Sequence, residues 1–588
     1  MLASRRDWIA PGLVWLFVAA LSALRIPAAV GGYLPDTDDQ MRFLQVRGLM
    51  NGAPWFDVNQ PRLLTPEGGL IHWSRLPDVF LAGLAWPLAP FLGEERALHV
   101  AAAIWPLVLF AGACFALALI VRRLGGGPAA TAAAIGCFAL SATAAQFQPG
   151  RIDHHGAQVV LLLTALAALL SPRRTAGSAI VAGLATAAML AIALEALPYA
   201  GGVILAFGLM WIVKGPAEAN RLQIFGATVA LTGAALYVLD APGLGASRAV
   251  CDAYGAGHAA ALIAGGGLLF GLSRFDGALT DWRLRLGGGA LAGAATLMVA
   301  AIAAPACFGD PYAGLDDEIR YLWLDTIAEA RSAFAILAIA PGSVVATLGY
   351  AIAALAVGLW LLSRTDDKVR WAGPLIALVL AVLASIYQIR GSIFAHAVAA
   401  IPAGLVLGLA IDHWLTARGP QAALRVAAAG LLATPLGWTT LSGPLAPAQV
   451  KSETPTALAS CATPTAANVV SALPQGAVFT EVDLGPWVLK ATPHAAYAAP
   501  YHRNPTGIAR VIDAFSNPVD EAASTFAELA ADYLAYCPGS PAMRLYAKRW
   551  PDGFAARMEA GQTPHWLTPL ERSDPTAPMA LYRIDLRN

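Results

Sequence analysis

Long apolar stretches separated by short charged clusters recur along this chain up to about residue 441. The stretches are roughly 16 to 22 residues long, about what an α-helix needs to cross the hydrocarbon core of a bilayer. The chain has 588 residues, of which 57% are apolar and only 13% charged. A water-soluble core cannot bury that much apolar surface, so the sequence predicts an α-helical polytopic membrane protein.

We expect about thirteen spanning helices. The pattern places them near residues 8–29, 99–121, 129–146, 156–170, 177–193, 198–213, 224–240, 257–274, 286–304, 333–362, 371–387, 393–411 and 422–441. The stretch 79–93 is also apolar, but it is short and broken by Pro87 and Pro90. We therefore interpret it as a re-entrant or interfacial segment.

Positively charged residues predict which side of the membrane each loop faces, because short cytoplasmic loops are enriched in Arg and Lys. In this chain the basic pairs and clusters between spans fall on one side of the thirteen-helix count. The N-terminus is therefore predicted to be cytoplasmic. A first outer loop at 30–98, a long outer loop at 305–332 and everything after the last span then lie on the extracytoplasmic side.

The composition changes after residue 441, where Pro, Thr, Ser, Asp and Tyr become more frequent and no later stretch is apolar enough to span. We expect a membrane domain at 1–441 and a small extracytoplasmic α/β domain at 442–588. Strands are predicted at 478–482, 533–536 and 579–584, and helices at 507–515 and 521–529.

The six cysteines divide by predicted location. Cys114 and Cys137 lie within predicted spans, whereas the other four fall on the outer face, where disulfides are possible. The natural pairs are Cys251 with Cys307 and Cys461 with Cys537, although spacing alone does not fix the connectivity.

The first outer loop begins with a group of carboxylates. The motif PDTDDQMR at 35–42 places Asp36, Asp38 and Asp39 close together directly after the first predicted span. Like charges this near raise each other's proton affinity unless a cation lies among them. The group indicates either a divalent metal site or a solvated loop.

Two further motifs fall on the same predicted face. RIDHH at 151–155 places Asp153 and His155 before a span, and this pair suits manganese or magnesium but also occurs as a polar helix cap. TIAE at 326–329 places Glu329 in the long outer loop. Loops of that length are usually functional or disordered, although Glu329 alone is typical of a surface acid. The convergence of three acidic motifs on one face predicts an active site.

Taken together, the motifs resemble the catalytic-subunit family of oligosaccharyltransferases, most closely the single-subunit archaeal and bacterial enzymes of the GT-C fold. The resemblance covers roughly residues 1–411. It rests on Asp36 six residues before Arg42, Trp55-Phe56-Asp57, Pro66-Glu67-Gly68, Asp153 with His155, Thr326-Ile327 with Glu329, and Arg390 in QIRGSIF.

The resemblance implies a GT-C membrane domain of thirteen spans with a C-terminal outer domain. It also implies a divalent metal, Mn²⁺ or Mg²⁺, held by Asp36, Asp153 and His155 with Glu329 as a further ligand. Asp36 and Glu329 would orient the acceptor as catalytic residues, and Arg390 would face the phosphate of the carrier. Members of this type act as single subunits, and a bacterial one would lie in the inner membrane with its active site in the periplasm.

One motif of the family is missing. Its members recognise an acceptor sequence through Trp-Trp-Asp, and the nearest match here is VDLGPWVL around Trp487. The acceptor is therefore left open among protein, lipid and polysaccharide. Further candidate substrate contacts, each with a surface or interfacial alternative, are Asp38, Asp39, His72, Arg75, Trp487, His502 and Arg503.

We predict a metal-dependent glycosyltransferase that moves a sugar or glycan from a polyprenyl phosphate or pyrophosphate carrier to an extracytoplasmic acceptor. The alternative within the same fold is transfer of a monosaccharide from a polyprenyl monophosphate to a lipid or polysaccharide. A transporter of lipid-linked sugar is less favoured, because transporters hold their sites near the membrane midplane and often show related halves. The expected partners are membrane lipid, the donor and the acceptor, with no nucleic acid.

Overall fold

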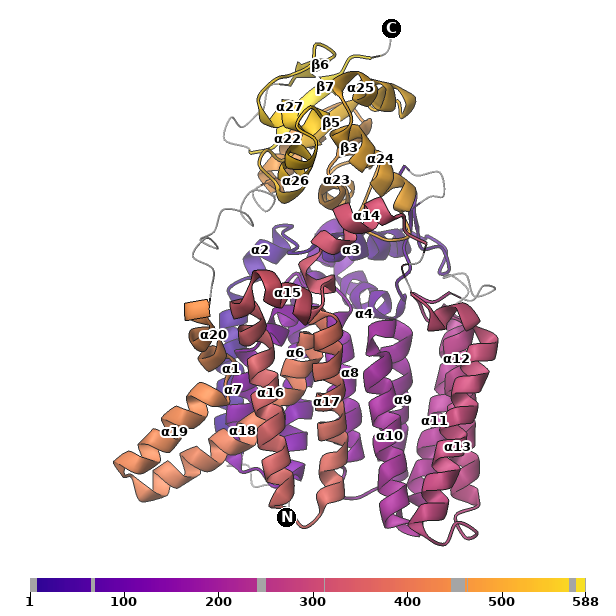
Figure 1. The fold of residues 1–588 in the computed structure, drawn as a ribbon, viewed down its shortest axis with the longest axis vertical. Helices are drawn as coiled ribbons and strands as arrows, with labels where there is room; N and C mark the ends of the chain where they lie inside the picture. The colour runs from indigo at the N-terminus through magenta and orange to yellow at the C-terminus, as the bar shows by residue number, and fades with distance from the viewer. Residues whose placement is uncertain are drawn as a thin grey trace.

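The computed structural model describes residues 8–64, 69–240, 250–310, 312, 314–445, 461–462, 464–570 and 578–586. Figure 1 shows a bundle of long helices with a small domain stacked on one end. The predicted motif Pro66-Glu67-Gly68 lies outside the described residues.

Eight helices of the described chain are long and apolar enough to cross a membrane. They are α6 (Glu94–Arg123), α10 (Leu197–Lys214), α11 (Pro216–Asp240), α12 (Ala256–Arg274), α13 (Trp282–Ala303), α16 (Pro341–Ser363), α17 (Ala372–Tyr387) and α18 (Ser392–Ala417). Shorter apolar helices are α1 (Ile9–Ala23), α7 (Pro128–Ala139), α8 (His155–Leu169) and α9 (Ala176–Ile192). Together they confirm a polytopic helical membrane protein.

Two of the predicted spans are not single helices. The stretch 333–362 is divided into α15 (Ala333–Ile339) and α16, which begins at Pro341. The stretch 422–441 is divided into α19 (Pro420–Leu432) and α20 (Pro435–Ser442). Proline at a first helical position lacks a backbone donor and starts a new helix instead of continuing the old one. The count of thirteen spans therefore stays a prediction.

Helix α8 lies in the middle of the bundle, and it places the site on a rigid element. Its sequence HGAQVVLLLTALAAL is apolar on all sides, which is typical of a helix surrounded by others. Residues are buried along its whole length, from His155 at its first position to Leu169 at its last.

Small residues bring α7 and α18 into close contact. A Cβ added to Gly404 would lie 2.4 Å from the Cβ of Ala134, and one added to Gly408 would lie 2.5 Å from the Cβ of Ala130. Small residues four apart let two helix backbones approach within a membrane, where packing replaces the hydrophobic effect as the main attraction.

The first outer loop folds onto the end of the bundle. It contains α2 (Ile26–Val30), α3 (Thr37–Met50), β1 (Asn59–Gln60) paired antiparallel with β2 (Gly69–Leu70), α4 (Leu76–Ala85) and α5 (Ala89–Leu92). A buried ion-pair network ties α3 to α4. Asp78 accepts from Arg42 Nη1 at 2.7 Å and from Arg75 Nη1 at 3.1 Å. Arg75 is 4% exposed and also donates to backbone carbonyls. Its guanidinium therefore belongs to this buried network and does not face a site where a substrate could bind.

The C-terminal domain is built on a five-stranded mixed sheet of order β4-β3-β5-β7-β6. The strands are β3 (Ala477–Thr480), β4 (Ala495–Ala496), β5 (Tyr533–Tyr536), β6 (Leu567–Pro569) and β7 (Ala580–Ile584). Its helices are α22 (Pro464–Ser471), α23 (Gly485–Ala491), α24 (Pro505–Ser516), α25 (Val519–Glu528), α26 (Pro541–Arg549) and α27 (Phe554–Glu559). All three predicted strands and both predicted helices overlap elements of this small α/β domain.

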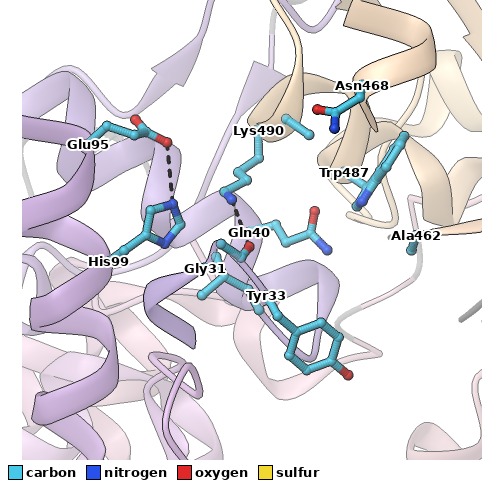
Figure 2. A pocket seen from close by; sticks show the side chains of 12 residues that line it. Gly31, Tyr33, Gln40, Glu95, His99, Ala462, Asn468, Trp487 and Lys490 are labelled. Atoms are coloured by element: carbon cyan, nitrogen blue, oxygen red, sulfur yellow. Dashed lines mark hydrogen bonds and ion pairs between the residues drawn. The ribbon is translucent and has the colours of Figure 1, made fainter. Parts of the chain in front are cut away.

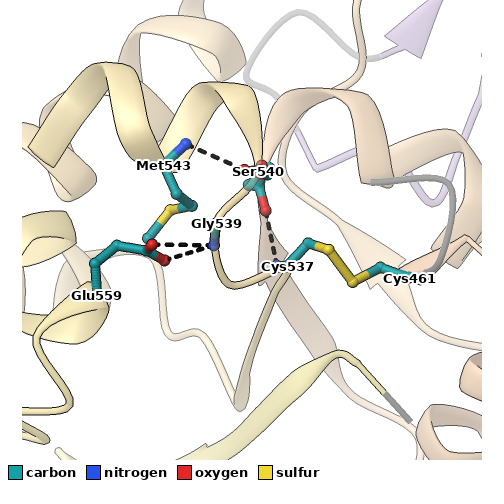
Figure 3. Close-up of a disulfide and its surroundings, with 7 residues drawn as sticks. Cys461, Cys537, Gly539, Ser540, Met543 and Glu559 are labelled. Atoms are coloured by element: carbon teal, nitrogen blue, oxygen red, sulfur yellow. Dashed lines mark hydrogen bonds between the residues drawn. A yellow bond between two sulfur atoms is a disulfide. The ribbon is translucent and has the colours of Figure 1, made fainter. Parts of the chain in front are cut away.

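Both predicted disulfides are present, Cys251–Cys307 and Cys461–Cys537. Cys461–Cys537 lies in a core that also contains Trp487 of α23. Figure 3 shows that the turn after Cys537 is fixed by the carboxylate of Glu559, which accepts from the Gly539 N–H at 3.0 Å. This disulfide therefore joins the start of the domain to its sheet.

The long outer loop packs against the C-terminal domain. Its helix α14 (Asp317–Leu322) contributes Ile319 and Leu322 to the core formed by α24 and β5, and Trp323 follows them into that core. A second small core joins Met41 and Leu44 of α3 to the C-terminal domain. The domain is thus held against the end of the membrane bundle at two places.

Candidate active site

The elements that carry the three acidic motifs lie at one end of the bundle, beneath the C-terminal domain (Figure 1). Asp36 is the N-cap of α3, where its Oδ1 accepts from the N–H of Asp38 at 3.2 Å. Asp153 lies in the turn before α8, and Glu329 lies in a 3-10 turn, Ala328–Ala330, that follows α14. The predicted convergence of these segments is therefore present in the fold.

Arg151 lies among the carboxylates of the first two motifs. Its Nη1 is 2.5 Å from Asp36 Oδ2 and 3.2 Å from Asp39 Oδ2, and its Nη2 is 3.4 Å from Asp153 Oδ2. Our sequence interpretation gave Arg151 no role. The structure shows that one guanidinium compensates part of this negative charge and so holds α3 and the α8 turn together.

Asp39 serves mainly to hold this arrangement. It is fully buried, and its Oδ1 accepts from the backbone N–H groups of Ile152 and Asp153 at 2.8 and 2.9 Å. Burial raises the pKa of Asp39 to about 7 against the opposing effect of Arg151. Both carboxylate oxygens of Asp39 are bonded inside the protein, so Asp39 holds Arg151 and the turn before α8 in place and does not face a ligand.

The second motif forms a compact group of carboxylates and imidazoles. His155 Nε2 is 3.3 Å from Asp153 Oδ2, and His155 Nδ1 is 2.5 Å from Glu195 Oε1. His154 lies between the same two carboxylates, with Nδ1 2.5 Å from Asp153 Oδ1 and Nε2 3.4 Å from Glu195 Oε1. Burial alone would raise the pKa of Asp153, but the neighbouring histidines hold it well below its usual value.

A divalent metal fits the donor atoms of this group. One atom each from Asp153, His154 and His155 lie within 4.8 Å of one another, and all three residues are buried. Carboxylate oxygen and imidazole nitrogen suit ions such as Mn²⁺ or Zn²⁺. A carboxylate behind a ligating imidazole is the usual outer partner, and Glu195 has that position behind His155.

The group differs in part from the predicted ligands. It contains Asp153 and His155, but in the described part of the chain neither Asp36 nor Glu329 joins it at that spacing. His154 was missed, although a histidine directly beside a predicted ligand is a visible signal. Glu195 precedes Pro198 in a short turn, and sequence alone left its role open between a helix end and an ion site.

The third motif lies within electrostatic reach of the first. Burial raises the pKa of Asp38 well above its usual value, and the charges of Asp153 and Asp36 raise it further. Arg151 opposes this shift, whereas Glu329 adds to it. Glu329 is therefore close enough to the beginning of α3 for its charge to act on Asp38.

Arg390 lies next to the segment that carries Glu329. The Ile389 N–H donates to the Arg331 carbonyl at 2.9 Å, which joins the two segments by their backbones. The Nη2 of Arg390 reaches the hydroxyl oxygen of Tyr312 at 3.5 Å. Arg390 makes no ion pair with a carboxylate among the described residues, so its guanidinium is available to an anion.

No protein-family model and no curated protein matches the sequence. Among solved structures, the oligosaccharyltransferase AglB from Archaeoglobus fulgidus, in complex with an inhibitory peptide and a dolichol-phosphate, is 15% identical with a TM-score of 0.62, over 98% of this chain and 74% of that one. The same organism's enzyme with Zn and sulfate is 14% identical with a TM-score of 0.59, over 89% and 67%. A third structure, tethered to an acceptor peptide containing an NVT sequon, is 16% identical with a TM-score of 0.59, over 89% and 68%.

This chain has the fold of an oligosaccharyltransferase. The match confirms the predicted GT-C architecture, in which a helical membrane domain is followed by a smaller domain with a sheet. At these identities the likeness shows the fold alone.

A second polar cluster of this oligosaccharyltransferase fold joins three separate segments. Asp252, beside the Cys251 disulfide, accepts from Arg503 Nε and Nη2 at 2.6 and 2.7 Å and lies 2.7 Å from His502 Nε2. The ring of His72 lies 4.6 Å from that of His502. His502 and Arg503, predicted as substrate contacts, therefore bind Asp252 and join the C-terminal domain to the loop that carries it.

Trp487 has a different place from the sequon motif that it was compared with. It lies on α23, is 4% exposed and lines a pocket of about 220 Å³ between that helix and the first outer loop. The N-terminus of α6 forms a further wall of this pocket.

Proposed function

We propose that this protein is a glycosyltransferase that moves a sugar or glycan from a polyprenyl phosphate or pyrophosphate carrier to an extracytoplasmic acceptor. The observation that carries the proposal is the buried group of Asp153, His154 and His155 at the end of the membrane bundle. Asp36 is joined to it through Arg151, and Arg390 lies close to the Glu329 segment. Charged groups this near a bilayer core are costly, so a cluster of them points to function.

Arg390 is the proposed contact for the carrier phosphate. A guanidinium presents fixed donors that match phosphate oxygens in pairs and keeps its charge at all relevant pH values. The position of Arg390 at the start of α18 puts this charge at the end of a membrane helix, which is where the phosphate of a lipid carrier lies. The solved AglB complex with a dolichol-phosphate agrees with a carrier of this class.

Asp36 is the proposed group that orients the acceptor and takes its proton. Its side chain is 40% exposed, unlike the buried Asp39 and Asp153. An exposed carboxylate held by an N-cap bond and by Arg151 has a fixed direction and can still reach a ligand. Glu329, on the opposite segment, is proposed to assist it.

Asp153 and His155, with His154, are proposed to hold a divalent cation. Of the two ions expected from the sequence, Mn²⁺ suits two imidazole nitrogens better than Mg²⁺, which prefers oxygen ligands. Such an ion neutralises charge that develops on a departing phosphate. Glu195 fixes the orientation of His155, so that its Nε2 remains directed at Asp153. A neighbour solved with Zn agrees with a metal at this fold.

The site is proposed to face the periplasm of a bacterial inner membrane, with the N-terminus in the cytoplasm and one subunit sufficient for activity. A transporter is less well supported, because the acidic groups lie at helix ends and in outer loops. Transporter sites lie near the midplane of the bilayer instead.

The test is sugar transfer by the full-length protein in nanodiscs, supplied with labelled polyprenyl phosphate and pyrophosphate donors. Asp36→Asn keeps the N-cap of α3, since Asn and Asp cap equally well. We expect it to lower transfer by about 100-fold or more because it removes the carboxylate that accepts the proton. The matched control is Asp281→Asn, which makes the same change at the N-cap of α13. Equal activity of both variants, or no consumption of either donor by the wild type, would refute the proposal.

A further inference from the structure

A pocket opens one helical turn from Asp36, between the membrane domain and α23. Figure 2 shows Glu95 and His99 on one side of it, Trp487 and Asn468 on the other, and Gln40 and Lys490 between them. Its volume of about 220 Å³ is smaller than the roughly 300 to 1,000 Å³ of sites for drug-sized ligands. It suits about one sugar ring.

The wall of the pocket contains polar atoms that have no partner in the protein. Gln40 and His99 are each only 6% exposed, and neither Gln40 Oε1 nor His99 Nδ1 makes a hydrogen bond. Unpaired buried polar atoms cost free energy, and most of those in native proteins have a partner. Two such atoms in the lining of one pocket point to a ligand that offers hydrogen-bonding groups.

The other lining residues narrow the class of ligand. Trp487 supplies a broad apolar surface, and Asn468 supplies an exposed amide. The lining contains one carboxylate, Glu95, and one ammonium group, Lys490, so its formal charges balance. Glu95 lies 3.5 Å from His99, and Lys490 donates to the Gly32 carbonyl at 2.9 Å. A ligand with many hydroxyl groups, one apolar face and no net charge matches this lining, and a sugar has those properties.

The pocket continues outward into a wider hollow of about 530 Å³. That hollow shares Glu95, Lys490 and Ala491 with the pocket and is otherwise lined by Arg47 and Arg62 among others. A chain of sugars whose last ring is in the pocket therefore has space to leave it.

The pocket is connected to the site by α3. The Gln40 N–H donates to the Asp36 carbonyl at 3.2 Å in the first turn of that helix. Tyr33 and Leu34, which precede Pro35 and Asp36, line the pocket. A ligand held by Gln40 is therefore anchored to the same helix turn that holds the Asp36 carboxylate.

We propose that this pocket binds the terminal sugar of a neutral glycan, and that this glycan is the acceptor. The inference rests on the proposed function. A hydroxyl oxygen of the bound sugar forms a bond to C1 of the donor sugar while the bond from C1 to the phosphate oxygen breaks. The hydroxyl proton passes to Asp36, and the carrier leaves with the electron pair on its phosphate or pyrophosphate.

The test measures binding of the full-length protein in nanodiscs to an array of neutral glycans ending in hexoses or N-acetylhexosamines. Gln40→Leu keeps the size of the side chain and removes its amide, so we expect binding to weaken about three- to tenfold. Asn468→Ala should weaken it similarly. The matched control is Gln45→Leu, because Gln45 is on the same helix, is 7% exposed with an unpaired amide, and does not line the pocket.

Hydrolysis of the labelled donor by wild-type protein without acceptor reports on the proposed function by itself. Donor hydrolysis together with glycan binding that Gln40→Leu weakens and Gln45→Leu does not would support the inference. Donor hydrolysis with no glycan bound, with equal loss in both variants, or with transfer only to a sequon peptide or a lipid overturns the pocket assignment alone. Absence of hydrolysis overturns the proposed function.

Discussion

Glu195 offers the sharpest test of the proposed metal group, because it touches His155 without belonging to that group. Its Oε1 lies 2.5 Å from His155 Nδ1 and 3.4 Å from His154 Nε2. Glu195→Gln preserves the shape of the side chain and removes the charge that fixes the imidazole. A hydrogen bond to a charged group contributes about 1.5 to 3 kcal/mol. If that energy supports metal binding, affinity should fall about 10- to 100-fold, the range observed for outer partners of metal ligands.

The measurement is a Mn²⁺ titration of the tag-free protein in nanodiscs, with unbound Mn²⁺ followed by electron paramagnetic resonance. Glu218→Gln is the matched control. Glu218 is likewise a carboxylate paired with a cation, although its side chain is 3% exposed against 21% for Glu195. Its partner Arg221 donates to the carbonyls of Ala168 and Leu169 at the opposite end of α8. An affinity for Mn²⁺ that stays within about twofold in Glu195→Gln, or that falls equally in Glu218→Gln, would refute the reasoning.

Three further predictions concern stability, measured by thermal unfolding of the full-length protein. Gly404→Ala places a Cβ 2.4 Å from that of Ala134 and should lower the free energy of unfolding by about 1 to 3 kcal/mol. Gly208→Ala, whose added Cβ would have no atom within 4 Å, should not destabilise the protein. Equal melting temperatures of the two variants would contradict the close packing at Gly404. Burial raises the pKa of the Glu481 carboxyl to about 7, so its contribution to the free energy of unfolding is complete below about pH 4.5 and is lost as the pH rises through 7. Glu481→Gln should remove about 3 kcal/mol of this dependence of stability on pH. An unchanged slope of stability against pH in the variant would contradict the prediction. Cys461→Ser opens a loop with a sequence separation of 76 and should cost about 4 kcal/mol, which a melting temperature equal to that of the wild type would disprove.

The sequence predicts best where a single local signal decides the structure. Apolar length identified most membrane helices, and the sidedness of the cysteines led to both disulfides. The stretch 422–441 was expected as one continuous helix because apolar composition was weighed above Pro435, which begins a new helix. Proline position was the available signal, and it had been applied to Pro87 and Pro90 but not here.

The site was predictable in its motifs and not in its contacts. Asp153 and His155 follow from a two-residue spacing, but Glu195 is 40 residues further along and meets His155 only because α9 returns the chain to the same end. Arg151 and Asp36 are likewise brought together by tertiary folding. Spacing carries no information about such pairs, since the distance between them is set by how the helices pack.

The disulfide between Cys461 and Cys537 has a consequence for when the protein becomes competent. Cys461 precedes Ala462 and the helix that carries Asn468, both of which line the proposed glycan pocket. Thiols are kept reduced in the cytosol and are oxidised after export. In the orientation proposed above, this wall of the pocket is completed only after export, so the proposed acceptor site would form in the same compartment as the donor and not around cytosolic glycans during synthesis.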